Sequence, residues 1–119
     1  MKLSEFDFRV YHNIRNEYIT DKYIISNLFN DLINGATDLI MDYEIELFTG
    51  LYDKGGVKIF AGDILNFRGK NYLVKMNKKL KTIIICESKD SAYIMYISKG
   101  NLKECKVIGN IHENEKLLK

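Results

Sequence analysis

The sequence lacks the segments that would place a protein in or across a membrane. Its 119 residues contain no apolar run close to the length needed to cross a bilayer. The first nine residues also lack the apolar core of a secretory signal peptide. The length falls in the usual range of one domain that can bury its own core. We therefore expect a single-domain cytoplasmic protein with no membrane partner.

Reactive residue types are scarce, and none is arranged in a known site motif. Cys86 and Cys105 are too far apart for a zinc knuckle or a redox Cys-x-x-Cys pair, so we expect two reduced, partly buried thiols. His12 and His112 lie near opposite ends and are expected on the surface. The chain has no Gly-x-Ser-x-Gly turn, no Gly-rich phosphate loop and no His-Glu-x-x-His. We expect a protein without enzyme activity, catalytic residues or cofactors.

A group of carboxylates in the middle of the chain lacks the spacing of a metal site. Glu44 and Glu46 would project from one strand face, where a hard cation such as magnesium could bridge them. Asp38 and Asp42 lie nearby, but no third ligand stands at a recognisable spacing and no EF-hand loop is present. We expect no metal site, and a face that is solvated or opposed by a basic neighbour.

Charge is divided unevenly along the chain. Residues 1–50 hold nine acidic and four basic side chains, a net charge of −5, whereas residues 51–119 hold fourteen basic and seven acidic ones, a net charge of +7. Such a division has three explanations: the halves attract each other within one chain, chains assemble through unlike surfaces, or the basic half binds a polyanion. Charge alone does not rank these three.

The first third of the chain predicts a hairpin followed by a helix. Residues 6–11 alternate like a half-buried strand, turn residues follow at 13–16, and residues 17–19 return. The helix is expected at about residues 22–34, with Asp21 as its N-cap and Asn34-Gly35 at its end. Its apolar residues form one stripe, which consists of Ile24, Ile25, Leu28, Phe29, Leu32 and Ile33.

The rest of the chain is typical of short antiparallel strands. Tyr43, Ile45 and Leu47 alternate with Glu44 and Glu46, so one face of that strand is apolar and the other acidic. Gly-rich turns and β-branched runs then follow at close spacing: strands are expected at 57–60, 64–67, 72–76, 82–86, 92–97 and 106–111. The fold class predicted is α+β: a small, strongly bent antiparallel sheet or SH3-like barrel with an N-terminal hairpin, one amphipathic helix and a short C-terminal helical turn. Within one domain, residues 1–42 would form the hairpin and helix and residues 43–119 the β-rich part.

Several motifs resemble the YopX family of phage and prophage proteins. They are Phe8-Arg9-x-Tyr11, Phe48-Thr-Gly-Leu51, Asp53-Lys54-x-Gly56-x-x-Ile59-Phe60-x-Gly62-Asp63-Ile64 and Val107-Ile-Gly-Asn-Ile-His-Glu-Asn114 with Leu117-Leu118. The resemblance implies a phage or prophage protein in the cytoplasm of a bacterial host, an α+β fold with a β-barrel-like part, and self-assembly. It implies no activity and no catalytic residues.

Eight residues within these motifs are interpreted as structural. Glycines are expected where the backbone demands them, at Gly50, Gly56, Gly62 and Gly109. Polar side chains are expected to tie turns to nearby amides, at Thr49, Asp53, Asp63 and Asn110. These residues would recur in a family for reasons of fold rather than chemistry.

A basic segment supplies the alternative functional hypothesis. No acidic residue stands between Asp63 and Glu87, and cations there are interleaved with aromatic rings, as in a groove for single-stranded nucleic acid. The candidate binding residues are Arg68, Lys70, Tyr72, Lys75, Lys78, Lys79 and Lys81. The other interpretation is a solvated hairpin tip at 77–81, whose lysines also deter edge-to-edge pairing.

The predicted helix bears on assembly, because its apolar stripe is wide and the domain is small. If the β-rich part closes its own core, the stripe packs either on the sheet or against another chain. The second arrangement would give a homo-oligomer. The sequence therefore favours an oligomeric binding module, structural or regulatory, that engages a phage or host protein. The alternative is a nucleic-acid-binding accessory protein that uses the basic hairpin around residues 68–81.

Overall fold

The computed structural model describes residues 2–35, 41–77, 82–86, 94–96 and 99–118, and the chain divides into two compact units. The acidic unit is Asp7–Leu47; its eight acidic and three basic side chains give a net charge of −5. The basic unit is Met1–Phe6 with Phe48–Lys119; its fifteen basic and eight acidic side chains give a net charge of +7. The charge asymmetry seen along the sequence thus follows this division, which falls between Leu47 and Phe48.

Strands of the acidic unit form an antiparallel sheet in the order β2-β1-β3. They are β1 (Phe8–His12), β2 (Glu17–Ile19) and the first half of β3 (Tyr43–Tyr52). Val10 pairs with Ile19 on one side and with Ile45 on the other, so apolar residues meet across the three strands. Val10, Tyr11 and Ile19 are buried. The predicted N-terminal hairpin and the alternation of residues 43–47 are confirmed.

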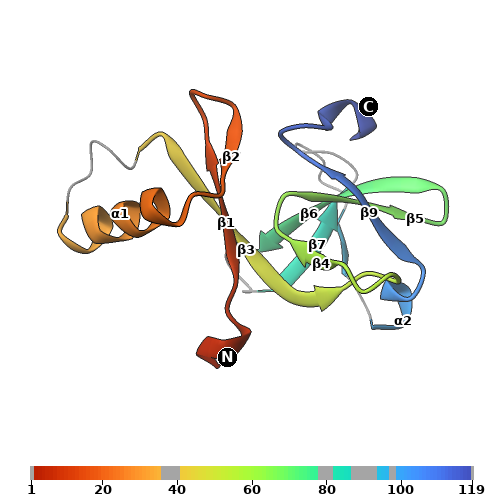
Figure 1. Cartoon of the computed structure of the whole chain (residues 1–119). Helices are drawn as coiled ribbons and strands as arrows, with labels where there is room; N and C mark the ends of the chain where they lie inside the picture. Colours follow the sequence, from red (N-terminus) through yellow and green to blue (C-terminus); the bar gives the residue numbers. More distant parts are fainter. Residues whose placement is uncertain (1, 36–40, 78–81, 87–93, 97–98, 119) are drawn as a thin grey trace. The chain divides into compact units, whose positions relative to one another are not determined.

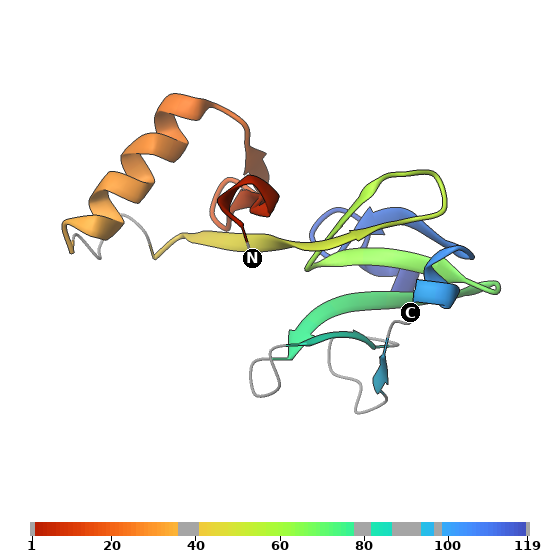
Figure 2. The ribbon, with the colours of Figure 1, turned by 90° about the horizontal axis from the view of Figure 1, so that it is seen from below.

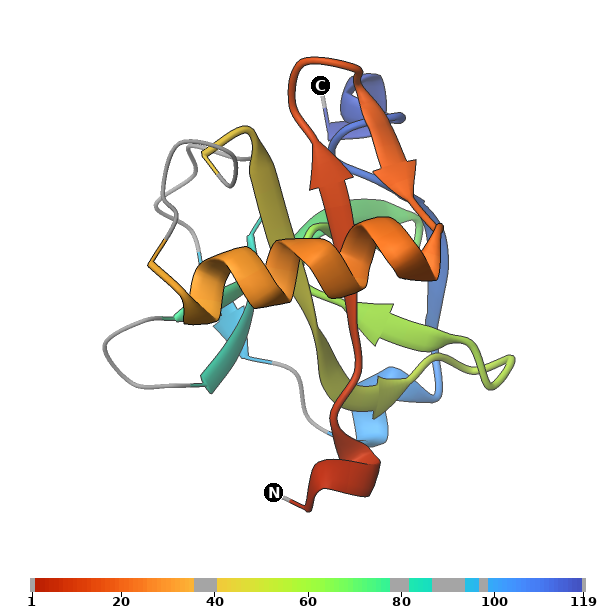
Figure 3. The ribbon, with the colours of Figure 1, turned by 60° about the vertical axis from the view of Figure 1, so that its left-hand side comes forward.

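Helix α1 (Lys22–Ile33) lies across β1 and β3 on one face of this sheet, as Figure 3 shows. It begins where the sequence predicts, because Asp21 Oδ1 accepts hydrogen bonds from the amides of Tyr23 at 2.8 Å and Ile24 at 3.3 Å. It ends at Asn34, followed by Gly35 with φ of 75°. Phe29 packs edge-on against Phe8, with 5.1 Å between ring centroids.

The basic unit is built on a five-stranded antiparallel sheet in the order β8-β7-β6-β5-β9, which curls strongly (Figure 1). Its strands are β5 (Asp63–Phe67), β6 (Lys70–Asn77), β7 (Thr82–Cys86), β8 (Ile94–Tyr96) and β9 (Cys105–Asn110). The second half of β3 pairs with β4 (Lys58–Phe60). Figure 2 shows β3 as one long strand that turns back into β4. Short helical segments are η1 (Leu3–Glu5), α2 (Lys99–Leu102) and η2 (Glu115–Leu118).

The core of the basic unit lies against this sheet, and each residue of its central cluster is less than one-tenth exposed. The cluster consists of Ile59, Leu65, Phe67, Tyr72, Val74, Leu102 and Cys105. An antiparallel, strongly bent sheet combined with helices confirms the α+β class predicted from the sequence. Within the described residues, no helix is long and apolar enough to cross a membrane.

The turn residues singled out in the sequence have the structural roles expected of them. Gly50, Gly56 and Gly62 have φ of 80°, 79° and 92°, a region that side chains rarely adopt. The register of β3 against β4 shifts between Phe48 and Tyr52. Thr49 stabilises this irregularity, because its hydroxyl donates to the carbonyl of Ile59 at 2.6 Å and accepts from the amide of Leu51 at 3.1 Å.

Candidate functional site

An apolar groove lies in the acidic unit between α1 and the sheet. Its volume is about 280 Å³. Every side chain that lines it is aliphatic or aromatic: Val10, Leu28, Phe29, Leu32, Tyr43 and Ile45. The helix supplies one wall and β1 with β3 the other, so the groove follows from the apolar stripe of α1 and from the alternation of residues 43–47. We call it the α1 groove.

The apolar stripe of α1 is only partly covered. No residue of α1 is buried, and Ile24, Leu32 and Ile33 are 37%, 51% and 81% exposed. On the opposite wall, Ile45 is 48% exposed. Leu32 and Ile45 are both exposed and both line the α1 groove, and an exposed apolar surface of this kind marks an interaction site more often than a plain solvated face. The helix therefore packs on its sheet and still presents apolar side chains for a further contact.

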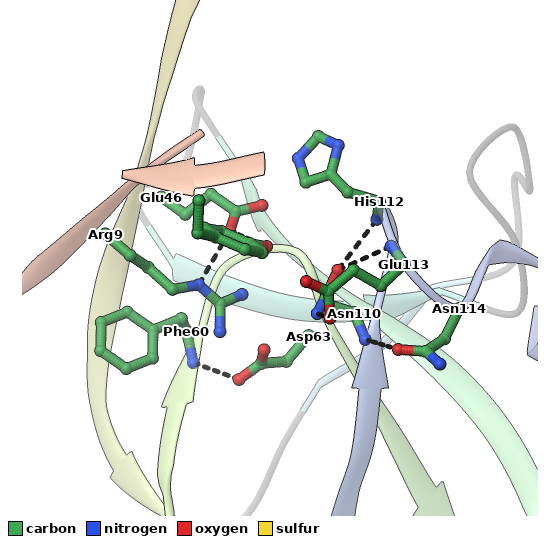
Figure 4. Close-up of polar contacts among 9 residues, drawn as sticks. Arg9, Glu46, Phe60, Asp63, Asn110, His112, Glu113 and Asn114 are labelled. Atoms are coloured by element: carbon green, nitrogen blue, oxygen red, sulfur yellow. Dashed lines mark hydrogen bonds and ion pairs between the residues drawn. The ribbon is translucent and has the colours of Figure 1, made fainter. Parts of the chain in front are cut away.

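The other face of the same sheet carries an ion pair. Glu46 Oε1 accepts a hydrogen bond from Arg9 Nε and another from the Tyr18 hydroxyl, both at 2.8 Å (Figure 4 shows the contact with Arg9). The Arg9 guanidinium also lies over the Tyr18 ring, 5.0 Å from its centroid. The expectation that the acidic face meets a basic neighbour is confirmed at Glu46.

A magnesium bridge between Glu44 and Glu46 does not fit this arrangement, because the Glu46 carboxylate is engaged by Arg9 and Tyr18. Asp38, the first carboxylate of that group, lies outside the described residues. In the part of the chain that the structure describes, no three His, Cys, Asp or Glu side chains gather as metal ligands would.

His12 is the last residue of β1, whereas the sequence suggested a turn residue, and His112 lies in the turn after β9; both are half-buried. His12 Nδ1 accepts from the amides of Ile14 at 3.2 Å and Arg15 at 3.0 Å, and its ring meets the Tyr43 ring edge-on at 4.5 Å. The amide of His112 donates to Asn110 Oδ1 at 3.1 Å. The hydrogen bonds of His12 to the following turn and the packing of its ring on Tyr43 explain why His12 is partly buried.

Cys105 is a fully buried thiol in the core of the basic unit. Its Sγ donates to the carbonyl of Asn101 at 3.2 Å. Burial raises the pKa of this thiol, and the negative charges of Glu104 and Asp53 raise it further. Cys105 is therefore a neutral, inert core residue. The side chain of Cys86 lies outside the described residues.

Asp53 fastens the β3–β4 turn to the outer edge of β9. Its Oδ1 accepts from the amides of Gly55 at 2.8 Å and Val57 at 2.9 Å, and its Oδ2 accepts from the amide of Val107 at 3.0 Å. Beside it, the amide of Lys54 donates to the carbonyl of Cys105 at 3.0 Å. The carboxylate thus pairs with an edge that would otherwise present open backbone groups.

The charge state of Asp53 makes the stability of this turn dependent on pH. Burial acts to raise the pKa of the Asp53 carboxyl, but hydrogen bonds from Val107, Val57 and Gly55 and the charge of Lys106 outweigh it, so the pKa is lowered. A lowered folded-state pKa means that the unfolded chain binds the proton more tightly. The stabilisation is therefore present above the ordinary aspartate pKa of 3.8 and is lost as the pH falls through the lower folded value.

We expect the free energy of unfolding to decline below about pH 4, and more steeply in the wild type than in the variant Asp53→Asn. The amide cannot be protonated in this range, so the variant lacks this contribution to the pH dependence. Urea unfolding at a series of pH values between 2.5 and 6 measures this difference, through the shift of the unfolding midpoint at constant slope. Equal slopes of stability against pH in the two proteins would contradict the assignment to Asp53.

A second polar cluster holds the turn that follows β9 (Figure 4). Asn110 Oδ1 accepts from the amides of His112 at 3.1 Å and Glu113 at 2.9 Å, and Asn114 Oδ1 accepts from the amide of Asn110 at 3.2 Å. Asp63, which is 1% exposed, accepts through Oδ2 from the amide of Phe60 at 2.7 Å. The predicted structural roles of Asp63 and Asn110 are confirmed.

Gly109 is required by close packing against Asn114. A Cβ built at Gly109 would lie 2.5 Å from Asn114 Oδ1 and 2.8 Å from its Cβ, so the whole side chain of Asn114 would have to move. We expect Gly109→Ala to lower the free energy of unfolding by about 2 kcal/mol, because it breaks the bond to Asn110 and strains the turn. Thermal unfolding measures this loss. The variant Gly109→Ala/Asn114→Gly removes the clash, and a failure to recover part of the loss would contradict the packing explanation.

The structure describes four of the candidate binding residues: Arg68, Lys70, Tyr72 and Lys75. Arg68, at φ of 52° in the β5–β6 turn, forms an ion pair with Glu104 at 3.1 Å and lies over the Phe67 ring. Lys70 Nζ lies 5.9 Å from the ring centroid of Tyr72, which is 8% exposed and belongs to the core. Lys75 is half-buried in β6. Lys78, Lys79 and Lys81 lie outside the described residues.

Arg68 and Lys70 stand at the beginning of β6, whose eight residues extend over roughly 25 Å. The buried ring of Tyr72 is not available to stack on a base. Among the described candidates, the exposed residues are the cations Arg68 and Lys70, and the aromatic ring that the sequence suggested as a stacking surface is buried.

The β3–β4 hairpin of the basic unit also carries exposed apolar side chains. Tyr52 and Val57 are 50% and 52% exposed, and Lys54 and Lys58 beside them are also exposed. We call these four residues the hairpin surface. A shallow hollow of about 410 Å³ adjoins it, lined by Gly50, Leu51, Tyr52, Asp53, Lys54, Leu102 and Lys103. Sequence reasoning assigned this hairpin only a structural role, although an aromatic residue next to lysines in a turn is a signal for binding.

Comparison with known proteins agrees with this fold. The family model described as YopX protein matches residues 7–119 of the chain. The structure is similar to the crystal structure of protein EF1440 from Enterococcus faecalis, with a TM-score of 0.64 and 23% sequence identity over 96% of this chain and 98% of that one. This likeness shows the shared fold. No protein with a curated description matches the chain.

Proposed function

This chain belongs to the YopX family, and from that premise we propose that it is a non-enzymatic module that assembles with further copies of itself through the α1 groove. The observation that carries the proposal is the incomplete cover of the helix. Leu32 lines the groove and is half exposed, although it belongs to the apolar stripe of α1. Burial of such a side chain stabilises a complex by about 2 kcal/mol.

A second copy is the occupant that the charges favour. The groove belongs to a unit with a net charge of −5, and the same chain carries a unit with a net charge of +7. Opposite fields of this size bring unlike surfaces of two copies together and speed their encounter. We also propose that the protein is encoded by a phage or prophage and acts in the cytoplasm of the bacterial host, as the family resemblance implies. The assembly would bind a phage or host protein there.

Size-exclusion chromatography with light scattering tests the proposal. We expect the mass to exceed that of one 13.9 kDa chain at micromolar concentration and to fall on dilution. A mass of one chain at every concentration and at low and high salt would overturn it.

The same measurement tests nucleic-acid binding around residues 68–81. Short single- and double-stranded oligonucleotides are added, and binding through phosphates would be lost steeply as salt rises. Assembly that is indifferent to the oligonucleotides supports the module proposed here. A monomer that shifts only with oligonucleotides at low salt would replace it with the accessory role.

A further inference from the structure

The charge of the acidic unit disfavours an assembly in which the α1 grooves of two copies pack against each other. If the α1 grooves of two copies packed against each other, two units of −5 would face one another across the contact. Like charges placed together at an interface weaken it and exclude the pairing. The partner surface on the second copy should therefore be basic and should carry an apolar side chain that can enter the groove.

The hairpin surface has both properties. Tyr52 is half exposed, and tyrosine is among the residues that most often anchor an interface. Its ring is held edge-on against Phe48, with 5.5 Å between centroids, and Lys58 Nζ lies 4.9 Å from the same Phe48 ring. The three amides bound by Asp53 fix the turn that carries Lys54. The surface is thus ordered before a partner arrives, which lowers the entropic cost of docking.

Two aspartates are sequence neighbours of residues that line the groove: Asp31 precedes Leu32 on α1, and Asp42 precedes Tyr43 at the start of β3. Both aspartates are half-buried. The two aspartates carry negative charges, and the hairpin surface carries an equal number of positive charges on its two lysines.

We propose that the α1 groove of one copy binds the hairpin surface of the next copy, with Tyr52 in the groove and Lys54 and Lys58 beside Asp31 and Asp42. The inference rests on the proposed function and names the surface that completes it. Two copies can exchange this contact reciprocally in a two-fold dimer, or each copy can repeat it with the next in a closed ring or an open filament.

Reciprocal charge reversal tests this contact. Asp31→Lys places a cation beside the groove, and Lys54→Glu places an anion on the hairpin surface, so each single variant should associate roughly tenfold more weakly at low salt. The double variant Asp31→Lys/Lys54→Glu restores opposite charges between copies and should recover the wild-type association. Lys116→Glu makes the same change of charge on an exposed residue of η2 and should leave association unchanged.

The aromatic anchor gives a second measurement. Tyr52→Ala should weaken association about thirtyfold, the loss typical of an interface hot spot. Tyr23→Ala is the matched control, because Tyr23 is 84% exposed on α1 and does not line the groove. Thermal unfolding of each variant shows that the units remain folded.

The outcomes separate this inference from the proposed function. If the wild type assembles but Tyr52→Ala and Lys54→Glu assemble equally well, the contact between the α1 groove and the hairpin surface is overturned, while the proposal of self-assembly stands. If the double charge variant stays as weak as the single ones, the pairing of Asp31 with Lys54 is overturned. A wild type that is monomeric at all concentrations overturns both.

Discussion

Replacing Asp53 with alanine is expected to lower the free energy of unfolding by about 4 kcal/mol, a large share of the stability of a small domain. Three backbone amides lose their acceptor at once: Gly55 and Val57 in the turn and Val107 in β9. Asp53 is 8% exposed, so water replaces the carboxylate poorly. Urea unfolding at pH 7 measures the change through the shift of the midpoint at constant slope.

The variant Asp53→Asn separates the geometry of this contact from its charge. Its carbonyl oxygen can still accept from Gly55 and Val57, whereas its amino group opposes the amide of Val107. We expect the asparagine variant to lose about half as much stability as the alanine variant. A loss below about 1 kcal/mol in Asp53→Ala would mean that the turn and β9 hold together without the carboxylate.

Leu32→Glu should disperse the proposed assembly, with association weakened by roughly a hundredfold or more. Leu32 lines the α1 groove, and burial of an unpaired carboxylate there is far less favourable than burial of a leucine. Because Leu32 is 51% exposed in the single chain, the change should leave the fold intact. Light scattering across a dilution series gives the association constant, and circular dichroism reports the fold.

Ile33→Glu is the matched control for this variant. Ile33 is the next residue of α1 and is 81% exposed, but it does not line the groove. The two variants add the same charge to the same unit, so general repulsion affects them equally. If Ile33→Glu disperses the assembly as much as Leu32→Glu does, the contact involves the outer side of the helix instead of the groove.

Local patterns in the sequence predict much of the acidic unit. The cap at Asp21 and the end at Gly35 depend on residues within a few positions of one another, and both are confirmed. Of the predicted apolar stripe of α1, Leu28, Phe29 and Leu32 line the groove. The alternation of Tyr43 and Ile45 with glutamates likewise predicts which face meets the helix. The sequence could not show that the stripe of α1 is wider than the surface its own sheet covers, because that depends on the packing distance between helix and strands.

Contacts between distant residues account for what the sequence does not predict. Asp53 is recognisable as a turn residue, but its bond to Val107 joins residues 54 positions apart. Tyr72 stands among lysines in the sequence and suggests a stacking surface, yet its ring belongs to the core because of its place in β6. The hairpin surface was missed because its turn motif is explained by backbone geometry alone.

The pairing of β5 with β9 bears on the order in which the chain folds during its synthesis. Strand β1 pairs with β2 and with residues up to Leu47, so every pairing inside the acidic unit is available once the first 47 residues have emerged from the ribosome. In the basic unit, Asp63 pairs with Asn110 and Phe67 with Cys105. The edge of β5 that pairs with β9 therefore cannot be completed until residues 105–110 have been synthesised. A chain released before residue 105 would carry a finished acidic unit and a β5 strand with one edge open to the wrong partner.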